Sequence, residues 1–175
     1  MNNMKKILVI LFVCLLVLTG CEKHNHEEEN EVKKPVRLKE ITGEVLKANL
    51  DKNENIVIDE STITNQVAYY TYEYEGVIIG LLAVRNSSGK VIVVVNTCQS
   101  CGGSPYAYFV QVGEYIQCQN CGNLFAIDEL DNLTPDGCNP IGIEDRKDKD
   151  GKIIIGTKQL KELKSKFENW QGPKI

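Results

Sequence analysis

Five cysteines in the second half of the sequence constrain this chain more than any other feature. Cys98 and Cys101 form one Cys-x-x-Cys pair, Cys118 and Cys121 form a second, and Cys138 follows. Sixteen residues separate the two pairs, and another sixteen separate the second pair from Cys138. Two short thiolate pairs at this distance are the spacing expected of a four-cysteine metal site. The spacing therefore predicts a metal or cluster site, without indicating which metal it holds.

A glycine follows each pair and supports this interpretation. Gly102 comes directly after Cys101, and Gly122 comes directly after Cys121. A residue without a Cβ atom lets the backbone turn tightly and point N–H groups at sulfur. The alternative is a set of disulfides, which an oxidising compartment would favour. The odd number of thiols argues against complete pairing, and a bound metal would itself protect them.

Residues 1–20 have the pattern of a bacterial lipoprotein signal peptide. Lys5 and Lys6 precede an unbroken apolar run over residues 7–18, which is too short to span a bilayer comfortably. The run ends in Leu-Thr-Gly-Cys, which resembles a lipobox and implies a lipid on Cys21. An ordinary signal peptide or an uncleaved anchor is the alternative. In either case the sequence predicts a protein exported to the outer face of the cell membrane.

Residues 21–37 are polar and charged, and we expect them to form a flexible tether. His24 and His26 lie beside three glutamates and could gather metal weakly, but a plain linker is the simpler interpretation. The remaining residues, 38–175, are predicted to form one cysteine domain with its metal site between residues 96 and 143. The net charge of −4 gives no basic surplus that would indicate nucleic-acid binding.

The sequence before the first cysteine pair predicts a small antiparallel sheet. Residues 67–74, 77–84 and 91–95 are rich in strand-forming side chains and are separated by turn signals. The third segment is apolar throughout, so we expect it to be a central strand covered on both faces. It runs directly into Cys98 and would hold the first pair on a rigid element. Shorter strands are expected at residues 56–58, 110–112, 115–117 and 153–155.

The C-terminal part is predicted to contain a charged turn over residues 145–152 and then a helix. The helix is expected from Lys158 to Trp170, with Thr157 as its N-cap. Its lysine-rich face is expected to be solvated, and its apolar stripe consists of Leu160, Leu163, Phe167 and Trp170. The fold class is therefore mostly β (α+β). In it a small antiparallel sheet leads into a double-knuckle subdomain of zinc-ribbon or Rieske-like type, followed by an amphipathic helix.

Several phrases of the sequence resemble the membrane iron-sulfur-containing proteins called FtrD-like. They are AYYTYEYEG, NTCQSCGG, YIQCQNCGNLF and DGCNPIGI, within a similarity that covers about residues 56–170. The resemblance implies an extracytoplasmic cysteine domain that binds an iron-sulfur cluster or iron near a system of iron uptake. It also implies a set of candidate metal ligands, namely Cys98, Cys101, Cys118, Cys121 and Cys138. The spacing resembles a Rieske centre too, but no histidine lies nearby, so an iron cluster here would have a low potential.

Three hypotheses on function remain open. The first is a lipid-anchored metal or iron-sulfur protein that carries electrons or iron, with a redox or iron-transport partner in the membrane. The second is a structural zinc ribbon that serves as an interaction module. The third is a thiol–disulfide enzyme, which would need a nucleophilic cysteine at a helix N-terminus, and Cys98 instead ends a strand. No catalytic arrangement of histidine, serine or paired carboxylates stands out, so an enzyme role is left uncertain.

Cys138 is the residue that best separates these hypotheses. Asp136 and Gly137 form a turn signal before it, and Pro140 fixes the backbone just beyond it. We expect this rigid loop to point Cys138 at the two pairs, as a ligand, a bridging thiolate or a redox-active neighbour. The alternative is a small buried residue that fills a gap in the core.

Overall fold

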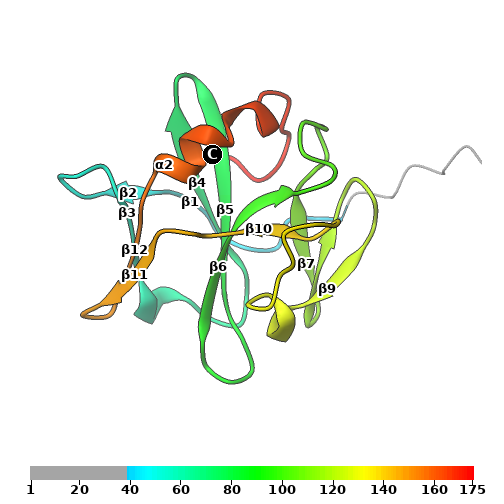
Figure 1. Ribbon diagram of the computed structural model, residues 1–175. Helices are drawn as coiled ribbons and strands as arrows, with labels where there is room; N and C mark the ends of the chain where they lie inside the picture. The colour runs from blue at the N-terminus through cyan, green and yellow to red at the C-terminus, as the bar shows by residue number, and fades with distance from the viewer. Residues whose placement is uncertain (1–38) are drawn as a thin grey trace, which may run out of the picture. The chain divides into compact units, whose positions relative to one another are not determined.

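Strands β4, β5 and β6 form the centre of residues 39–175, the part of the chain that the computed structural model describes. They span Ala68–Tyr74, Val77–Arg85 and Val91–Cys98, and they pair in sequence order as an antiparallel meander (Figure 1). Strand β1 (Val45–Lys47) adds in parallel to β4, and β10 (Pro140–Gly142) adds antiparallel to β6. The predicted meander is confirmed, and β6 is an interior strand of a five-stranded sheet.

The predicted signal peptide, Cys21 and the predicted tether lie outside the described residues. Within residues 39–175, none of the helices is both long enough and apolar enough to cross a bilayer.

A second sheet is formed by segments that are far apart in the sequence. Its order is β11-β12-β3-β2, with β11 at Arg146–Lys149, β12 at Lys152–Ile155, β3 at Ile56–Asp59 and β2 at Asn49–Leu50. The charged turn predicted over residues 145–152 is therefore wrong in its extent. The reversal needs only two residues, Asp150 and Gly151, with positive φ angles of 50° and 69°. That conformation suits a tight hairpin and leaves the preceding residues free to pair with β12.

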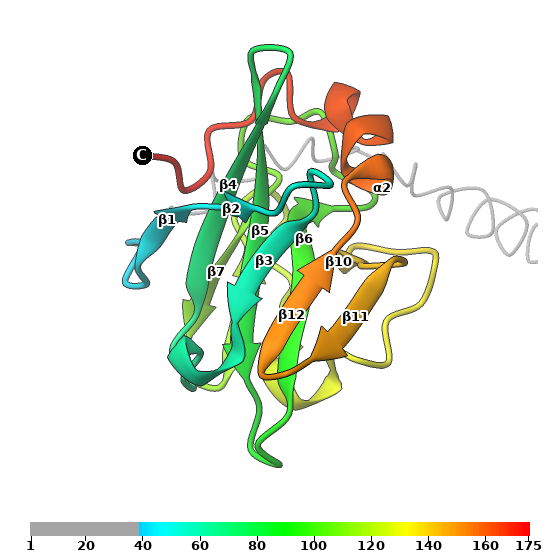
Figure 2. The ribbon, with the colours of Figure 1, turned by 90° about the vertical axis from the view of Figure 1, so that its left-hand side faces the viewer.

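A third sheet carries the second cysteine pair. It consists of β7 (Phe109–Val112), β8 (Tyr115–Cys118) and β9 (Leu124–Ala126) in sequence order. In Figure 1 it lies to the right of β5 and β6, and the four-stranded sheet lies to their left. Figure 2 views the molecule from the side of the four-stranded sheet, in front of β5 and β6. The central sheet is thus covered on both faces, as its continuous apolar strands require.

Alternate residues of the central strands face two separate apolar cores. Leu81 and Val93 pack in the cluster that includes Ile58 and Ile153 of the four-stranded sheet. Leu82 and Val94 point the opposite way, into the cluster that contains Phe109 and Ile116 of the three-stranded sheet, together with Cys98 and Cys118. Because successive side chains of a strand point to opposite faces, one apolar strand supplies both cores. All eight residues of β6 are buried.

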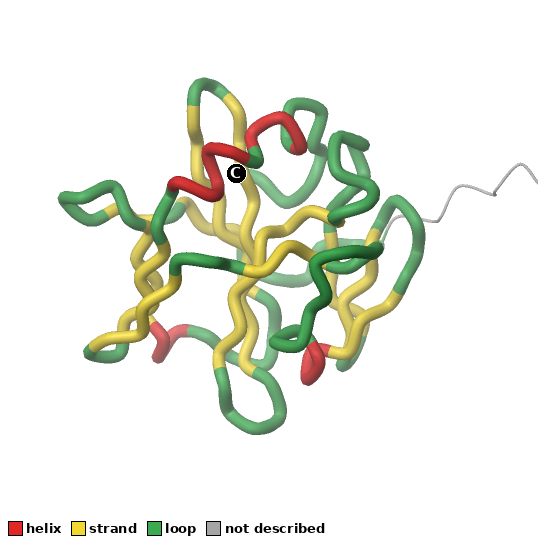
Figure 3. Tube along the Cα trace, in the orientation of Figure 1, coloured by secondary structure: helices red, strands yellow, loops and turns green. Residues whose placement is uncertain are grey.

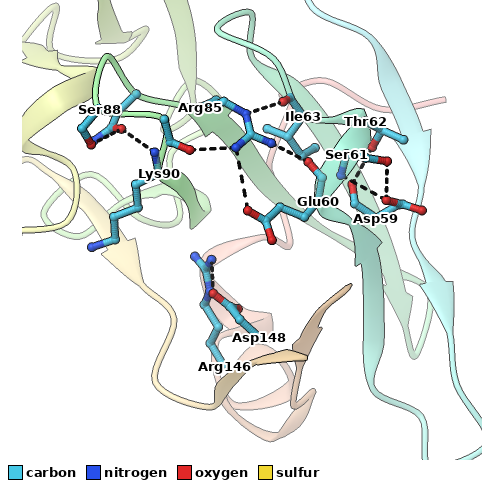
Figure 4. A network of polar contacts seen from close by, with 12 residues as sticks. Asp59, Glu60, Ser61, Thr62, Ile63, Arg85, Ser88, Lys90, Arg146 and Asp148 are labelled. Atoms are coloured by element: carbon cyan, nitrogen blue, oxygen red, sulfur yellow. Dashed lines mark hydrogen bonds and ion pairs between the residues drawn. The ribbon is translucent and has the colours of Figure 1, made fainter. Parts of the chain in front are cut away.

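Arg85 ties the end of β5 to the 3-10 turn η1 (Glu60–Thr62). Its guanidinium donates hydrogen bonds to the carbonyl oxygens of Ile63, Gly89 and Glu60 at 3.0, 2.7 and 2.7 Å (Figure 4). Arg85 is therefore occupied by backbone acceptors and fixes the far end of the β5–β6 hairpin. The cysteines lie at the opposite end of β6.

The C-terminal helix is shorter than predicted. Helix α2 spans Lys158–Glu162, and a 3-10 turn, η3, follows at Lys164–Lys166. The apolar stripe is nevertheless placed as predicted, since Leu160, Phe167 and Trp170 are buried. The indole of Trp170 packs on Gly80 and donates to the carbonyl of Asn96, so the chain bends onto the sheet instead of continuing as a helix. Thr157 occupies the N-cap position without a side-chain capping hydrogen bond.

Candidate metal centre

Pairing between β6 and β10 brings Cys138 to the first cysteine pair. Cys98 is the last residue of β6, and Pro140, the first residue of β10, lies opposite it. The Cys98 thiol donates to the carbonyl oxygen of Cys138 at 3.1 Å, and the N–H of Gln99 donates to the carbonyl of Asn139 at 3.0 Å. Further bonds fix the same loop, including 2.6 Å from the Ser100 hydroxyl to the carbonyl of Gly137. Cys138 therefore lies in a loop that is hydrogen-bonded to the loop of the first pair.

The chain between the two pairs brings the second pair to the same place. Cys118 is the last residue of β8, and Cys121 lies in the turn between β8 and β9. The N–H of Cys98 donates to the carbonyl of Ala107 at 3.3 Å, and the N–H of Gln119 donates to the carbonyl of Tyr108 at 2.8 Å. One short segment thus contacts both pairs. The residues after β6 and after β8, 99–108 and 119–123, are loops, which Figure 3 draws in green.

Four sulfur atoms converge in the resulting site. Those of Cys98, Cys101, Cys121 and Cys138 all lie within 4.8 Å of one another. Four sulfurs bound to one tetrahedral zinc at about 2.3 Å lie about 3.8 Å apart, so small side-chain movements would bring them to a common ion. The donor set also suits an iron-sulfur cluster, which is held by four cysteine thiolates. The residue types therefore suit either group, while the sulfur separations match a single ion, because the thiolates of a multi-iron cluster bind different iron atoms and lie farther apart.

Cys118 is placed differently from the other four cysteines. It is fully buried, it lies outside the set of four converging sulfurs, and its thiol is hydrogen-bonded to the sulfur of Cys98. No disulfide joins any of the five cysteines in the described part of the chain. The prediction that all five are ligands is not tested by these positions. They do place Cys138 against both pairs, as its loop predicted.

Hydrogen-bond donors surround the sulfur atoms. The backbone N–H groups of Ser100 and Cys101 lie against the sulfur of Cys98, and those of Asn120 and Cys121 lie against the sulfur of Cys118. In each pair, the sulfur of the first cysteine therefore accepts hydrogen bonds from the backbone N–H groups of the second and third residues after it. This is the arrangement expected when a turn holds a thiolate, because the N–H dipoles stabilise negative charge.

Burial and hydrogen bonding give the thiols different acidities. The thiol of Cys118 donates to Cys98 and, with nearby backbone N–H groups, lowers the pKa of Cys98 to about 5. The same bond, together with burial, raises the pKa of Cys118. Burial raises the pKa of Cys101 to about 12 and also raises the pKa of Cys138.

The two glycines that follow the pairs have different roles. Gly122 has a φ of 78°, a backbone conformation that favours glycine, so it serves the tight turn that the sequence predicted. Gly102 has no positive φ; the positive value in that loop belongs to Gly103, at 96°. What Gly102 provides is space, because a Cβ there would lie 2.9 Å from the Lys166 side chain.

Three polar residues of the site were not singled out from the sequence. The Ser100 hydroxyl donates to the carbonyl of Gly137, next to Cys138, and the Asn120 side chain hydrogen-bonds to the Cys101 thiol and partly offsets the rise in its pKa that burial causes. The sequence signal that Ser100 and Asn120 share is their position, since each directly precedes the second cysteine of its pair. Lys166 was assigned to a solvated helix face, whereas it is partly buried and contacts the first cysteine loop. The early end of α2 turns this residue toward the site.

The comparison with family models gives one match. Residues 62–167 match the model described as "Membrane iron-sulfur containing protein FtrD-like". No curated protein and no solved structure matches the chain. The matched segment covers more than half of the sequence and contains all five clustered cysteines. The chain therefore belongs to the FtrD-like family of membrane iron-sulfur containing proteins.

Proposed function

We propose that this protein holds an iron-sulfur cluster or iron and transfers electrons or handles iron at the outer face of the cell membrane. The observation that carries the proposal is the convergence of four cysteine sulfurs within 4.8 Å of one another. Cys98, Cys101, Cys121 and Cys138 would hold the group, and Cys118 would donate a hydrogen bond to the Cys98 sulfur. The family description supports iron-sulfur as the first choice of group.

The setting of the sulfurs suits electron transfer. Cys98 is fully buried, whereas Cys101, Cys121 and Cys138 are partly exposed. One side of a bound group would therefore be sheltered by the apolar core that includes Phe109 and Ile116. The other side would approach solvent closely enough for a redox partner. A bound cluster would supply one-electron chemistry, and shelter from water with N–H groups around sulfur sets its potential.

The test is a metal analysis and visible spectrum of the full-length protein, purified without oxygen. An iron-sulfur protein absorbs visible light and contains iron and acid-labile sulfide. A colourless protein with one zinc per chain would contradict the proposal and favour the second candidate, a structural zinc ribbon. The four converging sulfurs also suit that candidate, because they match a single tetrahedral ion.

A thiol–disulfide enzyme is the least favoured function. The lowered pKa of Cys98 would suit a nucleophile, but its side chain is 0% exposed. A substrate disulfide would have to reach this sulfur, and reactive cysteines are partly accessible for that reason. Cys98 also ends a strand and does not begin a helix.

We further propose that a lipid on Cys21 anchors the protein, with residues 21–37 as a tether and a redox or iron-transport protein of the membrane as its partner. The apolar run before Cys21 supports the anchor. Replacing Cys21 by Ser is expected to release the protein from membranes, since one cysteine would carry the lipid. If the variant sediments with membranes as the parent does, the lipid anchor is wrong.

A further inference from the structure

Lys166 contacts the loop of the first cysteine pair from a segment distant in the sequence. Its Nζ donates a hydrogen bond to the carbonyl oxygen of Gln99 at 3.2 Å, and Gln99 directly follows Cys98. Its own carbonyl accepts a hydrogen bond from the N–H of Gly103 at 3.0 Å. The side chain and the backbone of one lysine therefore hold both ends of the loop that contains Cys101.

The loop is shaped to admit this side chain. A Cβ on Gly102 would lie 2.9 Å from Cδ, 3.0 Å from Cγ and 3.0 Å from Nζ of Lys166. Such distances are shorter than ordinary van der Waals contact, so any larger residue at this position would displace the lysine. Since Gly102 has no positive φ, backbone conformation does not require a glycine there. Its missing side chain leaves room for the ammonium group next to Cys101.

Within residues 39–175, no carboxylate forms an ion pair with Lys166. By contrast, Lys164, in the same turn, pairs with Glu75 at 2.7 Å. Lys161 likewise pairs with Glu54 at 3.1 Å. The two neighbouring lysines thus serve ordinary surface pairs, and Lys166 alone among them turns to the cysteine loops.

The Lys166 ammonium lies against Gln99 and Gly102, which directly follow two of the cysteines, and a positive charge at this loop affects a group that the thiolates hold. Four thiolates carry more negative charge than a divalent ion or an iron-sulfur core balances, and reduction adds one negative charge more. A nearby ammonium therefore stabilises the reduced form more than the oxidised form and raises the reduction potential. We infer that Lys166 is a positioning residue of the cysteine site, which fixes the first cysteine loop and shifts the potential of the bound group upward. The inference rests on the proposed metal-binding function.

The test compares four full-length proteins purified without oxygen: the parent, Lys166→Met, Lys166→Arg and Lys164→Met. Methionine keeps an unbranched apolar side chain but removes the charge and the donor, whereas arginine keeps the charge. Redox titration followed by visible absorbance is expected to show a lower potential for Lys166→Met. Lys166→Arg is expected to have a potential close to that of the parent, because it keeps the charge. Lys164→Met, the matched control, is expected to have the same potential as the parent.

A second change displaces the lysine without altering it. Gly102→Ala places a methyl group against the Lys166 side chain. The reduction potential of this variant is therefore expected to be lower than that of the parent, as for Lys166→Met. High salt is expected to reduce the difference between Lys166→Met and the parent, because dissolved ions screen a partly exposed charge. Equal potentials for Lys166→Met and Lys164→Met, in folded proteins with equal iron content, would overturn the inference.

The role of Lys166 can be measured even if the iron-sulfur proposal fails. A colourless protein would contradict that proposal, and zinc would then be the probe, in competition with a chromophoric chelator. Loss of a residue that supports metal ligands typically weakens metal binding by about 10- to 100-fold, and we expect about tenfold for Lys166→Met. Lys164→Met should bind zinc as the parent does. Equal zinc affinity in all four proteins would overturn the inference.

Discussion

The indole Nε1 of Trp170 donates a hydrogen bond to the backbone carbonyl of Asn96 at 3.1 Å, two residues before Cys98. Next to it, the N–H of Gln171 donates to the carbonyl of Pro105 at 2.8 Å. The C-terminal segment therefore clamps the residues on either side of the first cysteine pair. The clamp is independent of metal, because the buried contacts of Trp170 with Gly80, Tyr108 and Phe167 hold it in place.

Metal removal is accordingly expected to loosen the cysteine loops and leave the rest of the sheet folded. A structural metal contributes on the order of 10 kcal/mol in small zinc domains that lack another core. Here the buried residues of β4 to β6 supply a core of their own. Hydrogen exchange after treatment with a chelator should show lost protection in residues 99–104, 119–123 and 134–139. Loss of protection throughout β4 to β6 in the same step would contradict this division.

Replacement of Cys138 by Ser is expected to reduce metal content more than replacement of Cys118 by Ser. The Cys138 sulfur belongs to the converging set of four, whereas the Cys118 sulfur lies outside it and its thiol donates a hydrogen bond to Cys98. Loss of such a supporting bond typically costs about 10- to 100-fold in metal affinity, and loss of a ligand should cost more. Metal per chain after desalting measures the difference. Unchanged content and spectrum in Cys138→Ser would assign Cys138 to packing.

Gly122→Ala is expected to destabilise the second cysteine turn. Gly122 has a φ of 78°, and a residue with a Cβ pays about 1–2 kcal/mol in this conformation. Gly142→Ala is the matched control, because Gly142 has no positive φ and nothing lies within 4 Å of its added methyl group. Urea unfolding of both variants checks the prediction. Equal unfolding midpoints for the two would show that the Gly122 turn relaxes without cost.

Tyr69 is expected to make stability fall in alkaline solution. Burial raises the pKa of its hydroxyl from 10.0 to about 12 in the folded protein. The folded state therefore holds this proton more tightly than the unfolded state. The contribution of Tyr69 to the free energy of unfolding is fully present below pH about 10, and it declines by about 2–3 kcal/mol as the pH rises to about 12. Tyr69→Phe should lessen the decline in urea midpoint between pH 9 and pH 11.5, and an identical decline would contradict the prediction.

The sequence predicted those parts of the fold and site that depend on local pattern. The meander of β4 to β6 follows from strand-forming residues separated by tight turns, and β6 could be identified as central because it is apolar throughout. The closeness of Cys138 to the pairs followed from the rigid residues around it. These features need only the neighbouring residues to specify them.

The remaining features depend on contacts between distant segments. Strand β12 pairs with β3 across more than ninety residues, as the Lys152–Asp59 hydrogen bond shows, and no local pattern specifies such a pairing. The early end of α2 follows from Trp170 reaching Asn96, so helix periodicity alone overestimated the length of the helix. Lys166 looked like a solvated lysine because only the bend after α2 turns it toward Gln99.

The pairing of β10 with β6 has a consequence for the order of folding. Cys138 reaches the other sulfurs only after β10 closes on β6, forty residues from Cys98. Contacts of this kind form late, because closure of the long intervening segment costs chain entropy before any contact compensates for it. A growing or unfolded chain presents two separate Cys-x-x-Cys pairs, which can each capture an ion incorrectly. If these sulfurs hold a metal, it would therefore bind in its correct site at the end of folding, when β10 has paired with β6.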